Sequence, residues 1–193
     1  MSLPRLILAS VSPRRAELLR RLGLEFEVIP SDAIESVDEQ LTAVEVCQLN
    51  AYRKARAVAK KFPDALVLGA DTLVALGTAI YGKPSDLADA ARMLRELQGR
   101  THLVVSGLCL LHLRQHRQKL LAESTRVTFR SLSDEEIRAY HSRIQPLDKA
   151  GAYAIQDHGD TIVESCNGSF SNVVGLPVER LVEALQAFDS DHA

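Results

Sequence analysis

Continuous apolar runs along the chain predict β-strands. In the longest run, at residues 65–76, the polar side chains are Asp71 and Thr72, and such continuity is typical of a strand covered on both faces. Two runs in the second half of the chain flank a polar turn at 115–118, which predicts a pair of strands. The predicted strands cover residues 6–9, 26–29, 65–76, 102–112, 120–129, 151–155 and 161–163.

Apolar residues at three- and four-residue steps predict helices between these strands. Ser12 before Pro13 is typical of a helix start, and Gly23 is expected to end this first helix. Ser133 with Glu136 three residues later forms a predicted capping box. The other helices are predicted over residues 41–62, 87–97 and 177–188. The alternation indicates an α/β or mixed α+β fold, with helices on both faces of a mixed sheet.

Length and composition favour one globular domain over residues 1–193. The chain has 193 residues and is 46% hydrophobic, a size at which roughly 70% of the unfolded surface is buried without disulfide or metal support. A net charge of −2 argues against a nucleic-acid partner. No apolar run reaches the roughly 18 residues of a membrane span, so no membrane association is expected.

The cysteines and the first residues indicate a cytoplasmic protein. Cys47, Cys109 and Cys166 are odd in number and far apart, as expected of reduced thiols rather than a disulfide framework. The N-terminal segment lacks the long apolar middle and small-residue cleavage site of a signal peptide.

Several charged residues stand where packing alone would not place them. Arg14 and Arg15 fall in the first turn of the first helix, where the helix dipole disfavours cations but free N–H groups bind phosphate. Two solvated surface arginines are the structural alternative. Lys54 projects from the apolar stripe of its helix, at the core edge where a lysine usually extends out to water.

Asp71 interrupts the most apolar run, so its carboxylate must be paired, hydrogen-bonded or metal-bound. Small residues before it leave room for a ligand, which favours a functional role over a structural one. Lys83, in the turn Gly82-Lys83-Pro84, and Glu35, in an acidic loop, are unremarkable when each is considered alone. The sequence contains no HExxH metal-binding motif. It also contains no GxSxG, Walker A or GxGxxG motif, which removes the main sequence support for a serine hydrolase, a P-loop NTPase or a Rossmann dehydrogenase.

Taken together, the motifs resemble those of the Maf family of nucleotide pyrophosphatases. They occur in the family's order along nearly the whole chain: residues 8–15 (LASVSPRR), 17–19 (ELL), 54–57 (KARA), 69–72 (GADT), 82–84 (GKP), 148–156 (DKAGAYAIQ) and 175–177 (GLP). The resemblance implies a Maf/inosine-triphosphatase-like fold, a twisted mixed sheet flanked by helices, with two lobes around a nucleotide cleft. It also implies hydrolysis of a nucleoside triphosphate to the monophosphate and pyrophosphate.

At three positions, Arg14, Thr72 and Gln156, the chain resembles the branch of the family that acts on dTTP and UTP rather than the branch that acts on 7-methyl-GTP. The Gln156 amide offers a donor and an acceptor for the edge of uracil or thymine, and Thr72 would set pocket depth or bond the base. One departure is Ile34, which stands where the family often has the first of two adjacent acids and leaves Glu35 as the second.

The implied mechanism gives each remaining residue a role. Ser12, Arg14, Arg15, Lys54 and Lys83 are predicted to bind the polyphosphate. Asp71 is the predicted catalytic residue, accepting the proton of the attacking water. Glu35 and Asp71 are predicted to hold a divalent cation, Mg²⁺ or Mn²⁺.

The sequence also permits other functions. One is a pyrophosphatase for 7-methyl-GTP, inosine-type or other modified nucleotides. Another is a non-catalytic regulator of cell division, and a third is a degenerate family member, for which Ile34 is the sequence hint. A homodimer is expected from base rates alone.

Overall fold

A mixed β-sheet organises the molecule. The computed structural model describes residues 4–35, 38 and 40–190. Within them the sheet has seven strands in the order β2-β1-β3-β5-β6-β7, with β4 paired to β3. The strands are β1 (Leu6–Leu8), β2 (Glu27–Val28), β3 (Leu66–Leu76), β4 (Ala79–Tyr81), β5 (Thr101–His112), β6 (Arg117–Phe129) and β7 (Val163–Asn167). β1 runs parallel to β2 and β3, whereas the β3–β5, β5–β6 and β6–β7 pairs are antiparallel.

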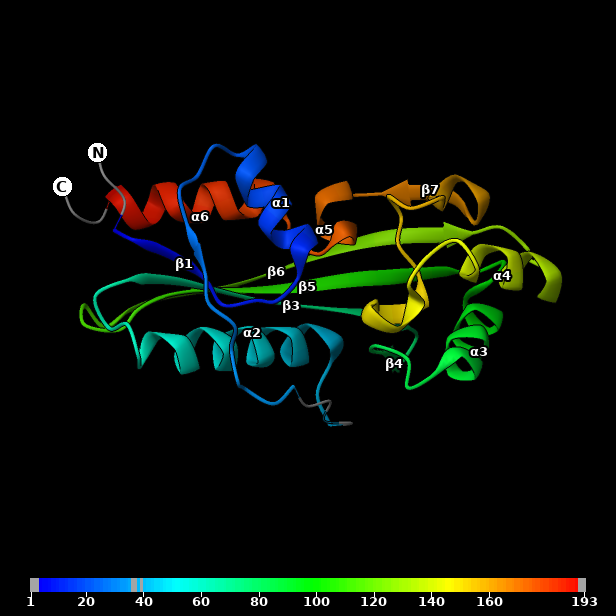
Figure 1. Cartoon of the computed structure of the whole chain (residues 1–193), viewed down its shortest axis with the longest axis horizontal. Helices are drawn as coiled ribbons and strands as arrows, with labels where there is room; N and C mark the ends of the chain where they lie inside the picture. Colours follow the sequence, from blue (N-terminus) through cyan, green and yellow to red (C-terminus); the bar gives the residue numbers. More distant parts are fainter. Residues whose placement is uncertain (1–3, 36–37, 39, 191–193) are drawn as a thin grey trace.

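Helices cover both faces of this sheet. They are α1 (Pro13–Arg21), α2 (Ala43–Ala59), α3 (Leu87–Leu97), α4 (Asp134–His141), α5 (Phe170–Val174) and α6 (Val178–Ser190). α2 lies on one face, and α1, α5 and α6 lie on the other (Figure 1). None of the helices within the described residues is both long and apolar enough to cross a membrane.

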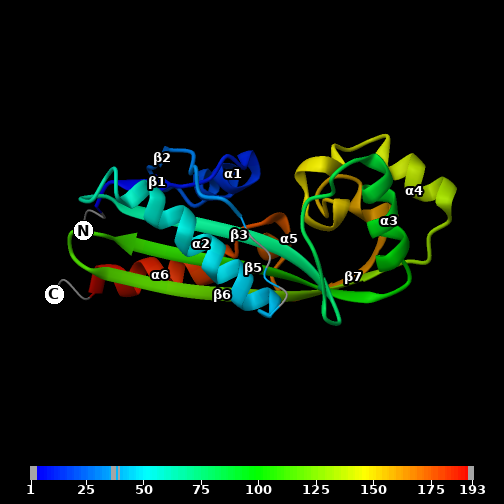
Figure 2. The same ribbon diagram turned by 90° about the horizontal axis from the view of Figure 1, so that it is seen from below.

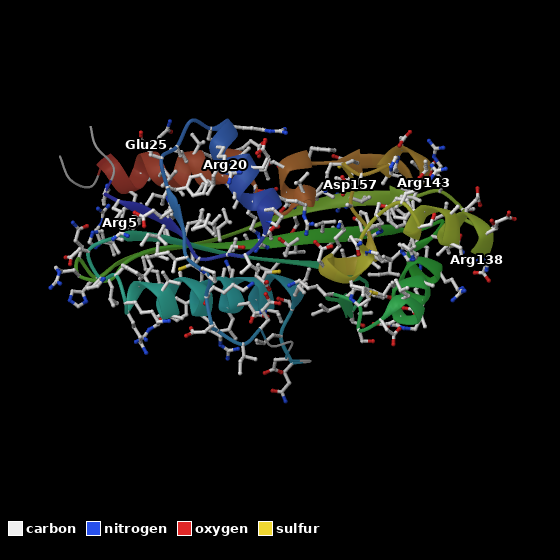
Figure 3. The ribbon with its side chains drawn as sticks, in the orientation of Figure 1. Arg5, Arg20, Glu25, Arg138, Arg143 and Asp157 are labelled. Carbon is white, nitrogen blue, oxygen red and sulfur yellow. The ribbon has the colours of Figure 1, made fainter. Side chains whose placement is uncertain are left out.

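The long strands β3, β5 and β6 extend through two lobes (Figure 2). β3 and β5 stay in register from Leu66 opposite His112 to Ala75 opposite Leu103. One end of the sheet is covered by α1, α2 and α6, and the other by α3 and α4 with the segment that follows α4 (Figure 2). Each lobe has its own core of buried apolar side chains. Charged side chains such as Arg5, Arg138 and Arg143 lie on the outside of the molecule (Figure 3).

Helix ends follow the predicted local signals in most cases. The capping box of Ser133 and Glu136 is present at α4, and Thr42 with Glu45 forms a second one at α2. Ser12 precedes α1 as its N-cap residue, but its side chain makes no capping hydrogen bond. α2 ends at Ala59, before the end predicted at residue 62, and α3 has its predicted bounds.

Two predicted strands are wrong or misplaced. Residues 151–155 are not a strand: Ala150–Ala152 forms a 3-10 turn, and Gly151 and Ala152 both have positive φ values, of 67° and 61°. An apolar run can be buried in a turn as well as in a strand, and local pattern does not separate the two. The strand predicted at 161–163 begins at Val163 instead and continues to Asn167. The short elements β4 and α5 had no predicted counterpart.

Candidate active site

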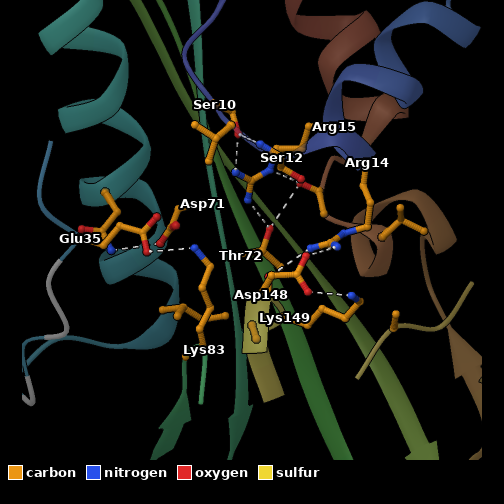
Figure 4. Close-up of a pocket in the computed structure, with 18 of the residues that line it drawn as sticks. Ser10, Ser12, Arg14, Arg15, Glu35, Asp71, Thr72, Lys83, Asp148 and Lys149 are labelled. Atoms are coloured by element: carbon orange, nitrogen blue, oxygen red, sulfur yellow. Dashed lines mark hydrogen bonds and ion pairs between the residues drawn. The ribbon is translucent and has the colours of Figure 1, made fainter. Parts of the chain in front are cut away.

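A cavity of about 640 Å³ is lined by residues of both lobes and by the middle of β3. It brings together side chains from the segment after β1, from α1, α2 and β3, and from the segments around residues 83 and 148–156. Every residue singled out in the sequence lines it: Ser12, Arg14, Arg15, Glu35, Lys54, Asp71, Thr72, Lys83 and Gln156. Figure 4 shows most of these side chains converging from the two sides of the cleft.

A lysine held between two carboxylates forms one wall of the cavity. The Nζ of Lys54 lies 2.7 Å from Oδ1 of Asp71 and 2.6 Å from Oε1 of Glu35. It also donates to the carbonyl of Ala70 at 3.2 Å. The Lys54 and Asp71 side chains are 9% and 6% exposed, whereas that of Glu35 is 45% exposed. The carboxylates therefore satisfy the buried ammonium group, as a charge in the interior requires.

Close contact between α2 and β3 places Lys54 beside Asp71. At Gly69, two residues before Asp71, an added Cβ would lie 2.1 Å from the carbonyl oxygen of Ala51 in α2. The absent side chain lets the helix backbone approach the strand, so Asn50 and Lys54, one turn apart on α2, reach Asp71. Asn50 Nδ2 donates to the second oxygen, Oδ2, of Asp71 at 3.0 Å.

The cations around Glu35 keep it ionised. Burial by itself raises the pKa of Glu35, but the hydrogen bond and charge of Lys54, with the charges of Lys83 and Arg15, outweigh it and lower the pKa. Lys83 Nζ lies 3.8 Å from Oε2 of Glu35, and its side chain is 53% exposed. Lys83 is thus the more accessible of the two lysines in this wall.

Arg15 is buried and extensively hydrogen-bonded to the protein itself. Its guanidinium donates to the carbonyls of Gly175 and Ala70, both at 2.9 Å. It also donates to Ser10 Oγ at 3.2 Å and to Thr72 Oγ1 at 3.0 Å. These acceptors are neutral, and burial lowers the pKa of Arg15 despite the charges of Asp71 and Glu35. Arg15 thus fixes β3 on both sides of Asp71, a role beyond the predicted phosphate contact.

Arg14 points across the cleft instead. Its Nη1 lies 3.0 Å from Oδ2 of Asp148, and its Nη2 donates to the carbonyl of Asp148 at 3.3 Å. Lys149 Nζ holds the other carboxylate oxygen, Oδ1, at 2.7 Å. The two arginines of one helical turn therefore face different surroundings, since Arg15 is 9% exposed and the Arg14 side chain 24%.

The remaining predicted residues lie around the same cavity. Thr72 Oγ1 accepts from Arg15 and lies 2.8 Å from Ser106 Oγ. Gln156, at the exposed edge, donates to Oδ2 of Asp157 at 3.2 Å. Ser12, at the N-terminus of α1, lines the cavity beside Arg14.

Sequence reasoning missed three polar residues of this site: Asn50, Asp148 and Lys149. Asn50 precedes Lys54 by four residues, so the helical step that marked Lys54 also pointed to it. Asp148 and Lys149 lie in a segment that the motifs included, but no local pattern predicted that Arg14, 134 residues away, would contact Asp148.

Metal binding would rest on few ligands. Among the described residues there is no cluster of three or more His, Cys, Asp or Glu side chains that could hold an ion. The carboxylates of Glu35 and Asp71 face each other, and the Lys54 ammonium group lies between them. Mg²⁺ commonly binds through one or two carboxylates completed by substrate phosphates and water, so this donor set fits such an ion. Ile34, beside Glu35, is 85% exposed and adds no ligand.

Comparison with known proteins identifies the family. A family model described as Maf-like protein matches residues 5–188. The chain belongs to the Maf family. A dTTP/UTP pyrophosphatase of Gloeobacter violaceus is 48% identical to this Maf chain over 185 residues, 96% of each protein. One of Moorella thermoacetica is 47% identical over 187 residues, which cover 97% of this chain and 96% of that protein.

Solved structures offer a more distant likeness to this Maf chain. A HAM1 protein from Coxiella burnetii has a TM-score of 0.45 and 18% identity, covering 66% of this chain and 73% of that one. The family resemblance read from the motifs is confirmed by the family model and by the relatives. The mixed sheet with helices on both faces, expected of the fold, is also confirmed.

Proposed function

We propose that this Maf chain hydrolyses dTTP and UTP to the nucleoside monophosphate and pyrophosphate. One observation carries the proposal: the buried carboxylate of Asp71, held by Lys54 and Asn50, lies in a cavity that Arg14 and Lys83 also line. A triphosphate needs cations for its charge and a base for the attacking water, and this cavity combines both. The relatives named dTTP/UTP pyrophosphatase support the substrate class.

The cations divide the work of holding the polyphosphate. Arg14 and Lys83 are partly exposed and are the accessible phosphate ligands. Ser12 and the N–H groups of the first turn of α1 add neutral donors at the positive end of a helix dipole. Lys54 contacts the reacting phosphate from the buried side, and Arg15, which also lines the cavity, adds its positive charge.

Asp71 is the proposed proton acceptor. A water placed between its carboxylate and the α-phosphorus of the substrate transfers a proton to Asp71 as its oxygen attacks phosphorus, and pyrophosphate leaves. Lys54 and Asn50 fix both oxygens of this carboxylate, so its orientation is set before substrate enters.

Glu35 and Asp71 are the proposed ligands of a divalent cation, Mg²⁺ or Mn²⁺. When bound, the ion neutralises charge on the phosphate oxygens and polarises them. Both carboxylates already face a positive group, the Lys54 ammonium, which supports their use as cation ligands. Gln156 and Thr72, which line the same cavity, are the proposed contacts to the base.

The proposal extends to the biological setting of the protein. We expect one cytoplasmic domain, without nucleic acid as partner, which assembles as a homodimer. Cys47 and Cys109 are buried, and burial raises the pKa of each thiol to about 12, as suits structural rather than reactive cysteines. Sedimentation of the purified protein measures the oligomeric state.

The function is tested by measuring pyrophosphate release from UTP, dTTP, CTP, GTP, 7-methyl-GTP and ITP, with Mg²⁺ and with excess EDTA. We expect UTP and dTTP to be preferred and EDTA to abolish turnover. Asp71→Asn should lower kcat at least about 100-fold, since general-base catalysis contributes factors of 10² to 10⁴. Asp64→Asn, which removes an exposed carboxylate paired with Arg114, is the matched control.

The outcomes separate the alternatives. A preference for 7-methyl-GTP or ITP would indicate that the substrates are modified nucleotides rather than UTP and dTTP. Tight binding of UTP without turnover would favour a regulatory protein. An active, folded Asp71→Asn variant would remove the proton-acceptor role.

A further inference from the structure

Three charged side chains connect the two lobes across the cleft. Arg14 belongs to the first turn of α1, whereas Asp148 and Lys149 follow α4 in the opposite lobe. The Asp148 carboxylate lies between the two cations, with Oδ2 at 3.0 Å from Arg14 and Oδ1 at 2.7 Å from Lys149. These contacts are drawn in Figure 4.

The arrangement is more constrained than an ordinary surface ion pair. Arg14 contacts Asp148 at two points, the carboxylate and the backbone carbonyl, so its guanidinium plane is fixed. The Lys149 side chain is 7% exposed, and its Nζ also donates to the carbonyl of Gln145 at 2.7 Å. Because this lysine is anchored to the backbone, it fixes in turn the carboxylate that holds Arg14.

Asp148 is ionised in this setting. Burial by itself raises the pKa of Asp148, but the hydrogen bonds from Lys149 and Arg14 outweigh it and lower the pKa. The three groups together carry one positive charge, so the cleft remains attractive to a polyphosphate.

We propose that Asp148, braced by Lys149, is a positioning residue that holds the Arg14 guanidinium over the cleft for the nucleotide. This inference rests on the proposed function. An arginine has five N–H donors, and two N–H donors of Arg14 are used by Asp148, which leaves donors for the substrate. A long side chain ordered before binding does not pay its conformational entropy when the nucleotide arrives.

If Asp148 instead competed with phosphate for Arg14, its removal would have the opposite effect on substrate binding. In that case, removing the carboxylate would tighten substrate binding. The geometry favours positioning, because Lys149 holds the carboxylate in place and the contact occupies part of the guanidinium only.

The test compares Asp148→Asn with the wild type in KM and kcat for UTP and in the Kd of a non-hydrolysable UTP analogue. Asn keeps an oxygen that can accept from Lys149, so the fold is retained. We expect KM and Kd to rise 3- to 10-fold, with kcat within twofold of the wild type. Asp160→Asn, which removes the same charge from an exposed position of the same lobe, should leave all three values unchanged.

A double-mutant cycle separates positioning from other roles. In the Arg14→Ala background, Asp148→Asn should change KM less than 1.5-fold, because the group that Asp148 positions is gone. A lower KM for Asp148→Asn, an equal effect with and without Arg14, or a loss of thermal stability with KM unchanged would each overturn the inference. If the wild type releases no pyrophosphate, the proposed function fails, and the Kd of the analogue still measures the coupling between Arg14 and Asp148.

Discussion

Arg15 shows how much one residue can organise in this site. Its guanidinium donates to four acceptors in three separate segments of the chain, at Ser10, at Ala70 and Thr72 on β3, and at Gly175. Two of these acceptors flank Asp71 along β3, so the position of the Asp71 carboxylate depends on a side chain that is not adjacent to it in the sequence. A phosphate contact and this framework role both remain compatible with its place in the cavity wall.

Replacing Arg15 by Lys should separate these two roles. Lysine keeps the charge but cannot reach all four acceptors, and each buried acceptor left unpaired costs about 1–3 kcal/mol. We expect urea denaturation to show a loss of about 2–4 kcal/mol in the free energy of unfolding, with kcat lowered and the Kd of a UTP analogue little changed.

Arg20→Lys is the control for Arg15→Lys, because Arg20 lies on the same helix with a side chain 62% exposed and pairs with Glu17 at the surface. It should stay within about 0.5 kcal/mol of the wild type. Unchanged stability of Arg15→Lys together with a much weaker Kd would identify Arg15 as a phosphate ligand first.

At the scale of elements, the packing of α2 on the sheet decides the site. Gly69 on β3 and Gly107 on β5 lie diagonally across this strand pair, because Gly107 pairs with Asp71, two residues after Gly69. A Cβ at Gly107 would lie 2.4 Å from the backbone of Cys47, as the one at Gly69 would crowd Ala51. The helix backbone therefore lies directly on these glycines, and Asn50 and Lys54 reach Asp71 as a result.

Gly69→Ala tests this close contact. The added methyl group must push α2 away from β3, so we expect a loss of about 3 kcal/mol or more in unfolding free energy and a fall in kcat as Lys54 moves. Gly82→Ala is the control for stability, since the nearest atom to its Cβ would be 3.9 Å away. If Gly69→Ala had the same free energy of unfolding as the wild type, α2 would be able to move away from β3 without loss of stability, which would contradict this prediction.

The whole molecule carries a pH-sensitive group in the core of its second lobe. His102 is 2% exposed and its ring packs against those of Phe129 and Tyr153, at centroid distances of 4.6 and 5.5 Å. Its Nε2 lies 2.9 Å from the Tyr153 hydroxyl. Burial lowers the pKa of His102 from 6.5 to about 4. The folded chain therefore keeps this histidine neutral where the unfolded chain protonates it.

His102 makes the stability of the folded chain depend on pH. Between pH 6.5 and about 4 the unfolded chain binds a proton that the folded chain does not, so stability falls as pH falls through this window. This one group should lower the free energy of unfolding by about 2 kcal/mol between pH 7 and pH 5. His102→Gln, which cannot titrate, should lose that much less between pH 7 and pH 5 in urea denaturation. Equal losses in the two proteins would exclude the histidine as the source.

Sequence patterns predicted the elements that local rules control. The continuous apolar run of β3, the stripe of α3 and the capping box at Ser133 are read from neighbouring residues, and the structure confirms each. Residues 151–155 failed because a buried apolar segment can turn as well as extend, and the positive φ of Gly151 and Ala152 depends on packing against β3 and α3.

The order of residues alone specifies which chemistry is available here: cations at the start of α1, a lysine on an apolar helix stripe and a carboxylate within an apolar strand. The folded structure sets how these groups pair. It engaged Arg15 with neutral oxygens, joined Arg14 to Asp148 across 134 residues, and placed Lys54 between Asp71 and Glu35. Periodicity reports which face of an element is buried, whereas the partner of a buried charge is set by the contact of distant elements, which periodicity does not encode.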